Sequence, residues 1–295
     1  MKIASFDDHR IGLVDGDVVR DTTAALPAAL DLMPQQRVNW LIENWDEVAP
    51  RLQEEASRAA ARPLDRVRLL PANPAPPHVF AAPANYRKHI GELGSRVVTK
   101  QGRSAREQGF FLKAPGSLVG HRGTIGLPKG STRRFDHESE LAVVVGKGGR
   151  DIPRADAMAH VFGYACLIDA TMRIEPGVAE EERSMRKSFA GFTPLGPWLV
   201  TADEVPEPQA LSNRLWVNGE LRQQADTSEM IVGIAELIEL ISSVLPIRPG
   251  DVIATGTPEG VGPFAPGDTL RIAIDGVGEM SVDVRENAAV SPRAY

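Results

Sequence analysis

A proline-rich segment divides the chain and limits what can form on either side of it. Residues 71–77 read Pro-Ala-Asn-Pro-Ala-Pro-Pro, with four prolines in seven positions. Proline has no amide hydrogen and a fixed φ, so this run fits neither a helix interior nor the centre of a sheet. The sequence therefore predicts a small N-terminal module over 1–70, a linker over 71–77 and a main domain over 78–295.

Short apolar segments separated by turn residues dominate both parts. Gly and Pro, 27 and 23 of 295 residues, favour a fold with many turns. Two helices are expected in the main domain, over 154–160 and 229–244, the second capped by Thr227 or Ser228. Because strands do not alternate regularly with helices, we predict an α+β fold that is mostly β, not a Rossmann or barrel fold. The strands expected lie at 1–6, 10–14, 140–146, 196–201, 215–218, 251–255, 269–274 and 280–284, with a further helical stretch over 40–52.

Composition excludes several classes of protein. The single cysteine, Cys166, can form neither an internal disulfide nor a thiol-based zinc cluster. The polar start lacks the apolar core of a signal peptide, and no apolar run approaches the length of a membrane helix. A net charge of −6 gives no electrostatic footprint for nucleic acid. These features predict a soluble cytoplasmic protein.

A pair of acidic residues stands at the start of an apolar run. Glu138 and Glu140 are two apart, so in a strand their carboxylates point to the same side. Like charges at this spacing repel, and a hard divalent cation such as Mg²⁺ or Mn²⁺ would relieve the repulsion. The alternative is a solvated strand edge.

A third carboxylate, Asp169, ends the apolar run 163–168. An unpaired carboxylate there would be costly, so Asp169 is either a helix N-cap or a third ligand of the same cation. Three carboxylates and one divalent cation sum to −1. The nearby Arg173 and Lys187 would reverse that sign and attract an anionic substrate.

His89 and Glu92 are three residues apart and would be neighbours on one helical turn. A carboxylate beside an imidazole fixes its tautomer and raises its basicity, as a general base for water requires. The alternative is a solvent-exposed pair on a polar helix.

A glycine-rich loop follows the strand expected at 251–255. Such a loop can bring backbone N–H groups and the hydroxyl of Thr255 or Thr257 close to a ligand. The segment 260–265 loosely matches a dinucleotide fingerprint, but Pro263 and Pro266 forbid the helix that must follow it. The alternative is a tight connection with no ligand.

Taken in order along the chain, these motifs resemble the fumarylacetoacetate hydrolase family. The resemblance covers about 78–285, and the N-terminal module resembles the one that many bacterial members carry. The motifs are Asn85-Tyr86 to His89 and Glu92, Phe110–Lys113, Asp136-x-Glu138-x-Glu140 with Leu141–Gly146, Phe162–Tyr164 to Asp169, Arg186–Phe189, Pro194–Trp198, Val217–Glu220 and Pro249–Gly260.

The resemblance implies a mixed, mostly β sandwich or roll with a small N-terminal α/β module, usually dimeric. It implies Mg²⁺ or Mn²⁺ on Glu138, Glu140 and Asp169, and a catalytic group formed by His89, Glu92 and Lys187. The implied substrate-binding residues are Tyr86, Lys113, Arg173, Gly256 and Thr257.

The implied activity is metal-dependent hydrolysis of a C–C bond in an acylpyruvate or related 2-oxo acid, in the catabolism of aromatic or sugar-derived acids. In this mechanism His89 activates water and Lys187 stabilises the oxyanion. Two alternatives stay open, namely an isomerase or decarboxylase of a 2-hydroxydienoate ring-cleavage product, and a metabolite-binding protein without catalysis.

Overall fold

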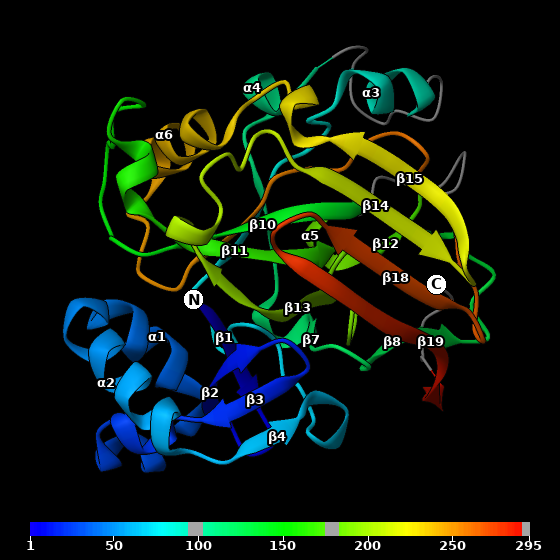
Figure 1. Ribbon diagram of the computed structural model, residues 1–295. Helices are drawn as coiled ribbons and strands as arrows, with labels where there is room; N and C mark the ends of the chain where they lie inside the picture. Colours follow the sequence, from blue (N-terminus) through cyan, green and yellow to red (C-terminus); the bar gives the residue numbers. More distant parts are fainter. Residues whose placement is uncertain (94–102, 175–182, 291–295) are drawn as a thin grey trace.

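The computed structural model describes residues 1–93, 103–174 and 183–290, and its strands form three sheets (Figure 1). The largest sheet has eleven strands and is mostly antiparallel. Ten of them follow the order β4 (Ala61–Pro63), β3 (Val18–Asp21), β2 (Arg10–Asp15), β1 (Lys2–Phe6), β13 (Thr193–Thr201), β11 (Val161–Ile168), β10 (Ser139–Val145), β16 (Val252–Ala254), β5 (Val79–Ala81) and β6 (Phe111–Lys113), and β7 (Leu118–Val119) pairs with β13.

The N-terminal part continues this sheet. β1 pairs with β13 in the register Lys2↔Val200, so β1 to β4 extend the sheet that begins in the main domain. α1 (Arg37–Glu43) and α2 (Trp45–Arg58) lie beside these strands (Figure 1). Leu41 and Leu52 of the two helices share one hydrophobic cluster with Leu195 of β13. The residues before and after 71–77 share one sheet and one hydrophobic cluster. That they are separate domains stays a prediction.

A second sheet of five strands shares a hydrophobic cluster with the main sheet, and a third, small sheet has three strands. The five-stranded sheet has the order β15 (Glu220–Asp226), β14 (Ser212–Val217), β18 (Thr269–Ile274), β19 (Gly278–Val290) and β8 (Thr124–Lys129). The small sheet has the order β12 (Thr171–Met172), β9 (Phe135–His137) and β17 (Gly262–Pro263). The mostly β fold predicted from the sequence is confirmed.

β10 is buried along its whole length because the sheet is covered on both faces. Leu141 and Val143 belong to the cluster shared with the five-stranded sheet, whereas Ala142 and Val144 belong to the cluster shared with α1 and α2. A strand covered on both faces is expected to be a continuous apolar run. Cys166 of the neighbouring β11 is fully buried in the first cluster, as expected of a core residue.

The two helices predicted in the main domain are shorter than expected, whereas the helical stretch predicted over 40–52 is longer and forms α1 and α2. Asp226 caps a 3₁₀ turn, Thr227–Glu229, and α6 (Ile234–Val244) begins only after Gly233. Thr227 does not cap because its hydroxyl donates to the Pro208 carbonyl oxygen. The helix expected over 154–160 is a 3₁₀ turn, Ala157–His160. The other helices are α3 (Arg87–Leu93), α4 (Ala105–Gln108) and α5 (Arg183–Arg186).

The described helices include none long and apolar enough to cross a membrane.

Candidate active site

The three acidic residues singled out in the sequence meet at one point of the main sheet. Glu138 links β9 to β10, Glu140 lies in β10, and Asp169 follows β11, the neighbour of β10. The Asp169 amide donates to the Glu138 carbonyl oxygen over 2.8 Å, which fixes the two backbones together. One carboxylate oxygen from each residue lies within 4.8 Å of the others. The backbone of two paired strands therefore assembles the triad.

All three side chains are buried, at 5% exposure or less. A solvated strand edge is thus excluded for Glu138 and Glu140. Asp169 is followed by the short strand β12, so it is not a helix N-cap. Both alternatives to a ligand cluster that the sequence left open are removed.

Two buried lysines neutralise part of this charge. Lys187 Nζ donates to Glu138 Oε2 over 2.6 Å, to Asp169 Oδ2 over 2.5 Å and to Thr171 Oγ1 over 2.8 Å. Lys113 Nζ donates to Asp169 Oδ1 over 2.5 Å and to the Phe192 carbonyl oxygen over 3.1 Å. Both ammonium groups are therefore occupied in holding the acidic residues in place.

A chain of ion pairs leads from the triad toward solvent. Arg173 Nη2 donates to Glu138 Oε1 over 2.6 Å, and its Nε donates to Asp136 Oδ2 over 2.7 Å. The other oxygen of Asp136 accepts from Arg134 Nε over 2.6 Å. The side chain of Arg134 is 42% exposed. Arg134 therefore places a partly free guanidinium at the outer end of the chain.

The two glutamates of the triad differ in their electrostatic surroundings. Burial opposes ionisation of Glu138, but Lys187, Arg173 and His89 outweigh it and hold its pKa well below the usual value. Burial raises the pKa of Glu140 well above its usual value, and the nearby Asp169 and Glu138 raise it further. Glu140 is thus the carboxylate of the triad that an added positive charge would stabilise most.

The donor set fits a hard divalent cation. Carboxylate oxygens are the ligands that Mg²⁺ and Mn²⁺ prefer. Three carboxylates and two ammonium groups leave one negative charge, so a divalent cation would turn the centre positive. Within the described residues, the carboxylate of Glu140 accepts one hydrogen bond, from the Gly256 amide over 2.7 Å. Its other oxygen is available to a metal.

The glycine-rich loop after β16 closes one side of the centre. Gly256 has φ +94°, and a Cβ there would lie 2.5 Å from Asn85 Cβ, so this position requires glycine. Thr257 is buried, and its Oγ1 accepts from Gln223 Nε2 over 2.9 Å. The Thr255 hydroxyl instead donates to the Leu141 carbonyl oxygen and is structural. The loop reaches the acidic centre through the Gly256 amide, and its predicted contact with a ligand stays a prediction.

His89 lies in α3 and is buried at 4% exposure, which excludes a solvent-exposed histidine. It is close enough to Glu138 to lower the pKa of that carboxyl. Glu92 belongs to the same helix, one turn on, but its side chain lies outside the described residues. The adjacent Tyr86 is buried, and burial raises its pKa, so its phenol is neutral. The roles of these residues stay predictions.

Two contributors are not among the site residues predicted from the sequence, although Asp136 belongs to the acidic motif. Asp136 shares the two-residue spacing of Glu138 and Glu140, which could have placed it on their face of the strand. Gln223 is a buried polar residue in β15, where exposed and buried positions alternate from Arg222 to Ala225. It could have been found as a polar side chain at an inward position.

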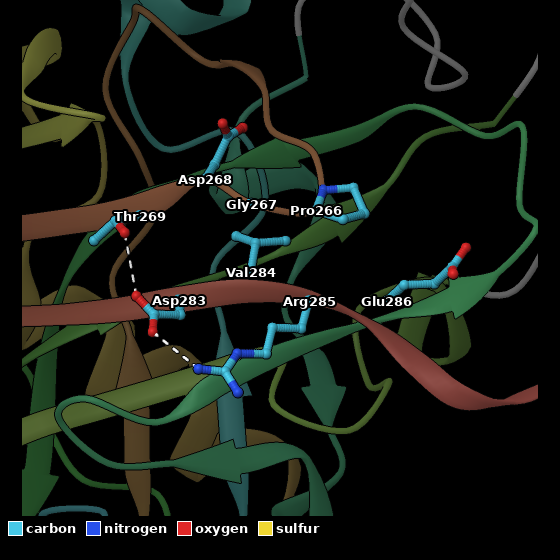
Figure 2. A pocket seen from close by; sticks show the side chains of 8 residues that line it. All are labelled: Pro266, Gly267, Asp268, Thr269, Asp283, Val284, Arg285 and Glu286. Atoms are coloured by element: carbon cyan, nitrogen blue, oxygen red, sulfur yellow. Dashed lines mark hydrogen bonds and ion pairs between the residues drawn. The ribbon is translucent and has the colours of Figure 1, made fainter.

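A groove lies elsewhere on the molecule, between 266–269 and 283–286 (Figure 2). Its sides carry Asp268, Asp283 and Arg285, and the Thr269 hydroxyl donates to Asp283. None of the predicted site residues lines this groove, so it is separate from the acidic centre.

Comparison with known proteins places this geometry in a family. Residues 78–285 match the family model described as the C-terminal part of fumarylacetoacetate (FAA) hydrolase. The chain belongs to the fumarylacetoacetate hydrolase family. A maleylpyruvate hydrolase of Aquipseudomonas alcaligenes is 42% identical over 291 residues, which are 97% of this chain and 99% of the relative.

Solved structures of the family have the same fold. Maleylpyruvate hydrolase from Sphingobium sp. SYK-6, in complex with manganese(II) and pyruvate, is 39% identical with a TM-score of 0.83, and the match covers 97% of this chain and 100% of that one. A 5-carboxymethyl-2-hydroxymuconate delta-isomerase from Mycobacterium smegmatis is 29% identical with a TM-score of 0.73, covering 98% of this chain and 100% of that one.

These relatives confirm that the protein is an enzyme of the fumarylacetoacetate hydrolase family. The hydrolase relatives agree with the predicted main activity, and the isomerase belongs to the class predicted as its alternative.

Proposed function

We propose that the protein is a divalent-metal-dependent hydrolase that cleaves maleylpyruvate, or a closely related acylpyruvate, into a carboxylic acid and pyruvate. The buried triad of Glu138, Glu140 and Asp169, balanced by two lysines, carries the proposal. The relative of 42% identity over nearly the whole chain, a maleylpyruvate hydrolase, supports the choice of substrate.

The charges of the site support an anionic substrate. With a divalent cation the centre is positive, which favours the carboxylate and 2-oxo group of a pyruvyl unit. The partly exposed guanidinium of Arg134 lies beyond Asp136 and Arg173, away from the triad. An arginine fork of this kind suits a second carboxylate, such as the distal one of maleylpyruvate.

His89 is proposed as the general base for water, with Glu92 fixing its tautomer. His89 takes a proton from water as the oxygen adds to the acyl carbonyl carbon. Collapse of the tetrahedral intermediate breaks the C–C bond, and its electron pair passes to the pyruvyl fragment as an enolate. The proton held on His89 then returns to that carbon, which releases pyruvate and the second acid.

A bound divalent cation would polarise the 2-oxo group and stabilise the negative charge of the enolate. We propose Mg²⁺ or Mn²⁺, held by the two glutamates and Asp169, and the manganese(II) complex of the Sphingobium relative supports this class of metal. We further propose that the enzyme acts in the cytoplasm as a homodimer, in the catabolism of aromatic acids.

The main role proposed for Lys187 is to hold the carboxylates of the triad in place. Its ammonium donates to Glu138, Asp169 and Thr171, so its three protons are used. A part in stabilising the oxyanion would require one of these bonds to be exchanged for the substrate. Lys113 is fully buried behind Asp169, which supports charge neutralisation over direct substrate contact.

The test is product analysis. The purified protein is incubated with maleylpyruvate, fumarylpyruvate and a 2-hydroxydienoate, each with Mn²⁺, Mg²⁺ or a chelator. Metal-dependent release of pyruvate as one of two fragments supports the proposal. An isomer or CO₂ as the only product would replace it with the isomerase or decarboxylase alternative, which the delta-isomerase relative supports. The Glu138→Gln/Glu140→Gln double variant serves as the control without metal-dependent turnover.

A further inference from the structure

The buried amide of Gln223 connects the acidic strand to the glycine-rich loop. Gln223 is 1% exposed. Its Oε1 accepts from the Ser139 amide over 3.1 Å, between the two ligand glutamates. Its Nε2 donates to Thr257 Oγ1 over 2.9 Å and to the Pro258 carbonyl oxygen over 3.0 Å. One side chain therefore touches both elements that enclose the centre.

The surrounding groups allow one orientation of this amide. A backbone N–H can only donate, so the atom facing Ser139 is the oxygen. A carbonyl oxygen can only accept, so the atom facing Pro258 is the NH₂ group. The Gln223 oxygen also lies 3.0 Å from His137 Nδ1, which must therefore carry a hydrogen. Gln223 is thus a donor, and not an acceptor, toward Thr257.

This orientation determines what the Thr257 hydroxyl can do. Its oxygen accepts the Gln223 proton, so its own proton is available to donate. Among the described residues, no group accepts that proton. Thr257 directly follows Gly256, whose amide holds Glu140, so its hydroxyl lies beside the acidic centre.

We propose that Gln223 is a positioning residue for substrate binding, which fixes Thr257 so that its hydroxyl donates to the carboxylate of the pyruvyl group. The inference rests on the proposed function for the identity of that ligand. Gln223 does not touch the substrate and acts through Thr257. The expected consequence is an effect on substrate affinity without an effect on the metal centre.

The test uses the full chain loaded with Mn²⁺ and the variants Gln223→Glu, Gln223→Met, Thr257→Val and their double variants. In Gln223→Glu a carboxylate still accepts from Ser139 and His137, but it also takes the Thr257 proton. We expect KM for the acylpyruvate and the Kd of pyruvate, measured by calorimetry, to rise about tenfold, as for loss of a hydrogen bond to a charged group. kcat and Mn²⁺ affinity should change less than twofold.

The double variants separate positioning from a general structural effect. In the Thr257→Val background, either change at Gln223 should add less than a further twofold, because the hydroxyl it orients is gone. Gln224 is the matched control, since it is the next residue of β15 and faces solvent. Gln224→Glu and Gln224→Met should leave KM and the Kd of pyruvate unchanged.

The inference is overturned if the pyruvate Kd is unchanged in both folded Gln223 variants. It is also overturned if a change at Gln223 still weakens pyruvate binding tenfold in the Thr257→Val background. If Gln223→Glu does not fold, Gln223→Met decides by the same two measurements. A wild-type protein that binds pyruvate but does not hydrolyse acylpyruvates overturns the proposed function alone. A wild-type protein that does not bind pyruvate overturns both.

Discussion

Replacing a proposed metal ligand should make the metal-free protein more stable. The ligand is Glu140, whose pKa is raised by burial and by the adjacent Asp169 and Glu138. In Glu140→Gln the side-chain oxygen can still accept from the Gly256 amide. Its NH₂ group can face the neighbouring carboxylates as a donor. The substitution therefore removes a repulsive charge and keeps the hydrogen bond.

The direction of the pH dependence follows from the raised pKa. Because the folded state binds the Glu140 proton more tightly than the unfolded chain, the stability from this proton is complete below the ordinary pKa of glutamate. It is lost as the pH rises toward the folded-state pKa, by about 1.4 kcal/mol per pH unit. Glu140→Gln has no such proton, so its advantage over the wild type should grow with pH.

The difference in unfolding free energy between Glu140→Gln and the wild type can be measured by thermal and urea unfolding in a chelating buffer at pH 5.5, 7.0 and 8.5. At pH 8.5 we expect Glu140→Gln to be more stable than the wild type by about 1–2 kcal/mol, which lies within the range of single stabilising substitutions. This corresponds to a rise in Tm of about 2–8 °C for a chain of this size. Glu43→Gln, an exposed position, is the control and should show no such trend.

With Mn²⁺ added, the wild type should become more stable than Glu140→Gln. At a metal concentration of about 100 times Kd, binding stabilises the wild type by about 2.7 kcal/mol, whereas the variant should gain little. The reasoning is refuted if Glu140→Gln is less stable than the wild type without metal at every pH. It is also refuted if Mn²⁺ stabilises the two proteins equally.

Three further changes test other parts of the site. His89→Ala should lower kcat for hydrolysis by about 10²–10⁴-fold with Mn²⁺ affinity retained, and an unchanged rate would remove His89 as the base. Lys187→Met leaves buried carboxylates without their partner, so unfolding by urea should reveal a loss of about 3–5 kcal/mol; a variant as stable as the wild type contradicts the ion-pair assignment. Arg134→Leu should raise KM for maleylpyruvate about tenfold and leave KM for an acylpyruvate with an uncharged tail unchanged. Equal effects on the two substrates would exclude Arg134 as the site of the second carboxylate.

The sequence predicted the three residues of the acidic centre because their spacing is local. Glu138 directly precedes β10, Glu140 lies two residues further on within that strand, and Asp169 ends a neighbouring apolar run. Such patterns follow from strand geometry alone. The mostly β fold was predicted for a similar reason, since turn residues and short apolar runs are local features.

Arg173 and Lys187 were expected near these carboxylates, but the contacts of Lys113 and Gln223 could not be predicted because they come from distant strands. Lys113 reaches Asp169 from β6, across a sequence separation of 56 residues. Gln223 reaches Ser139 from the other sheet, across 84 residues. The predicted start of α6, at residue 229, was wrong for a different reason. Asp226 caps a short 3₁₀ turn there, and Gly233 delays the helix, whereas apolar periodicity alone suggested one continuous helix.

The parts of the site differ in how firmly the fold holds them, and this difference bears on how one family contains both hydrolases and isomerases. Glu138, Glu140 and Asp169 are fixed by paired strands buried on both faces and by backbone hydrogen bonds. The proposed base lies on the seven-residue helix α3, and Arg134 lies at a partly exposed position outside the core. The rigid part would hold the divalent cation that we propose as the electron sink, which hydrolysis and isomerisation both require. The choice between the two reactions should therefore depend on α3 and on the residues beyond Asp136, where substitutions disturb the core least.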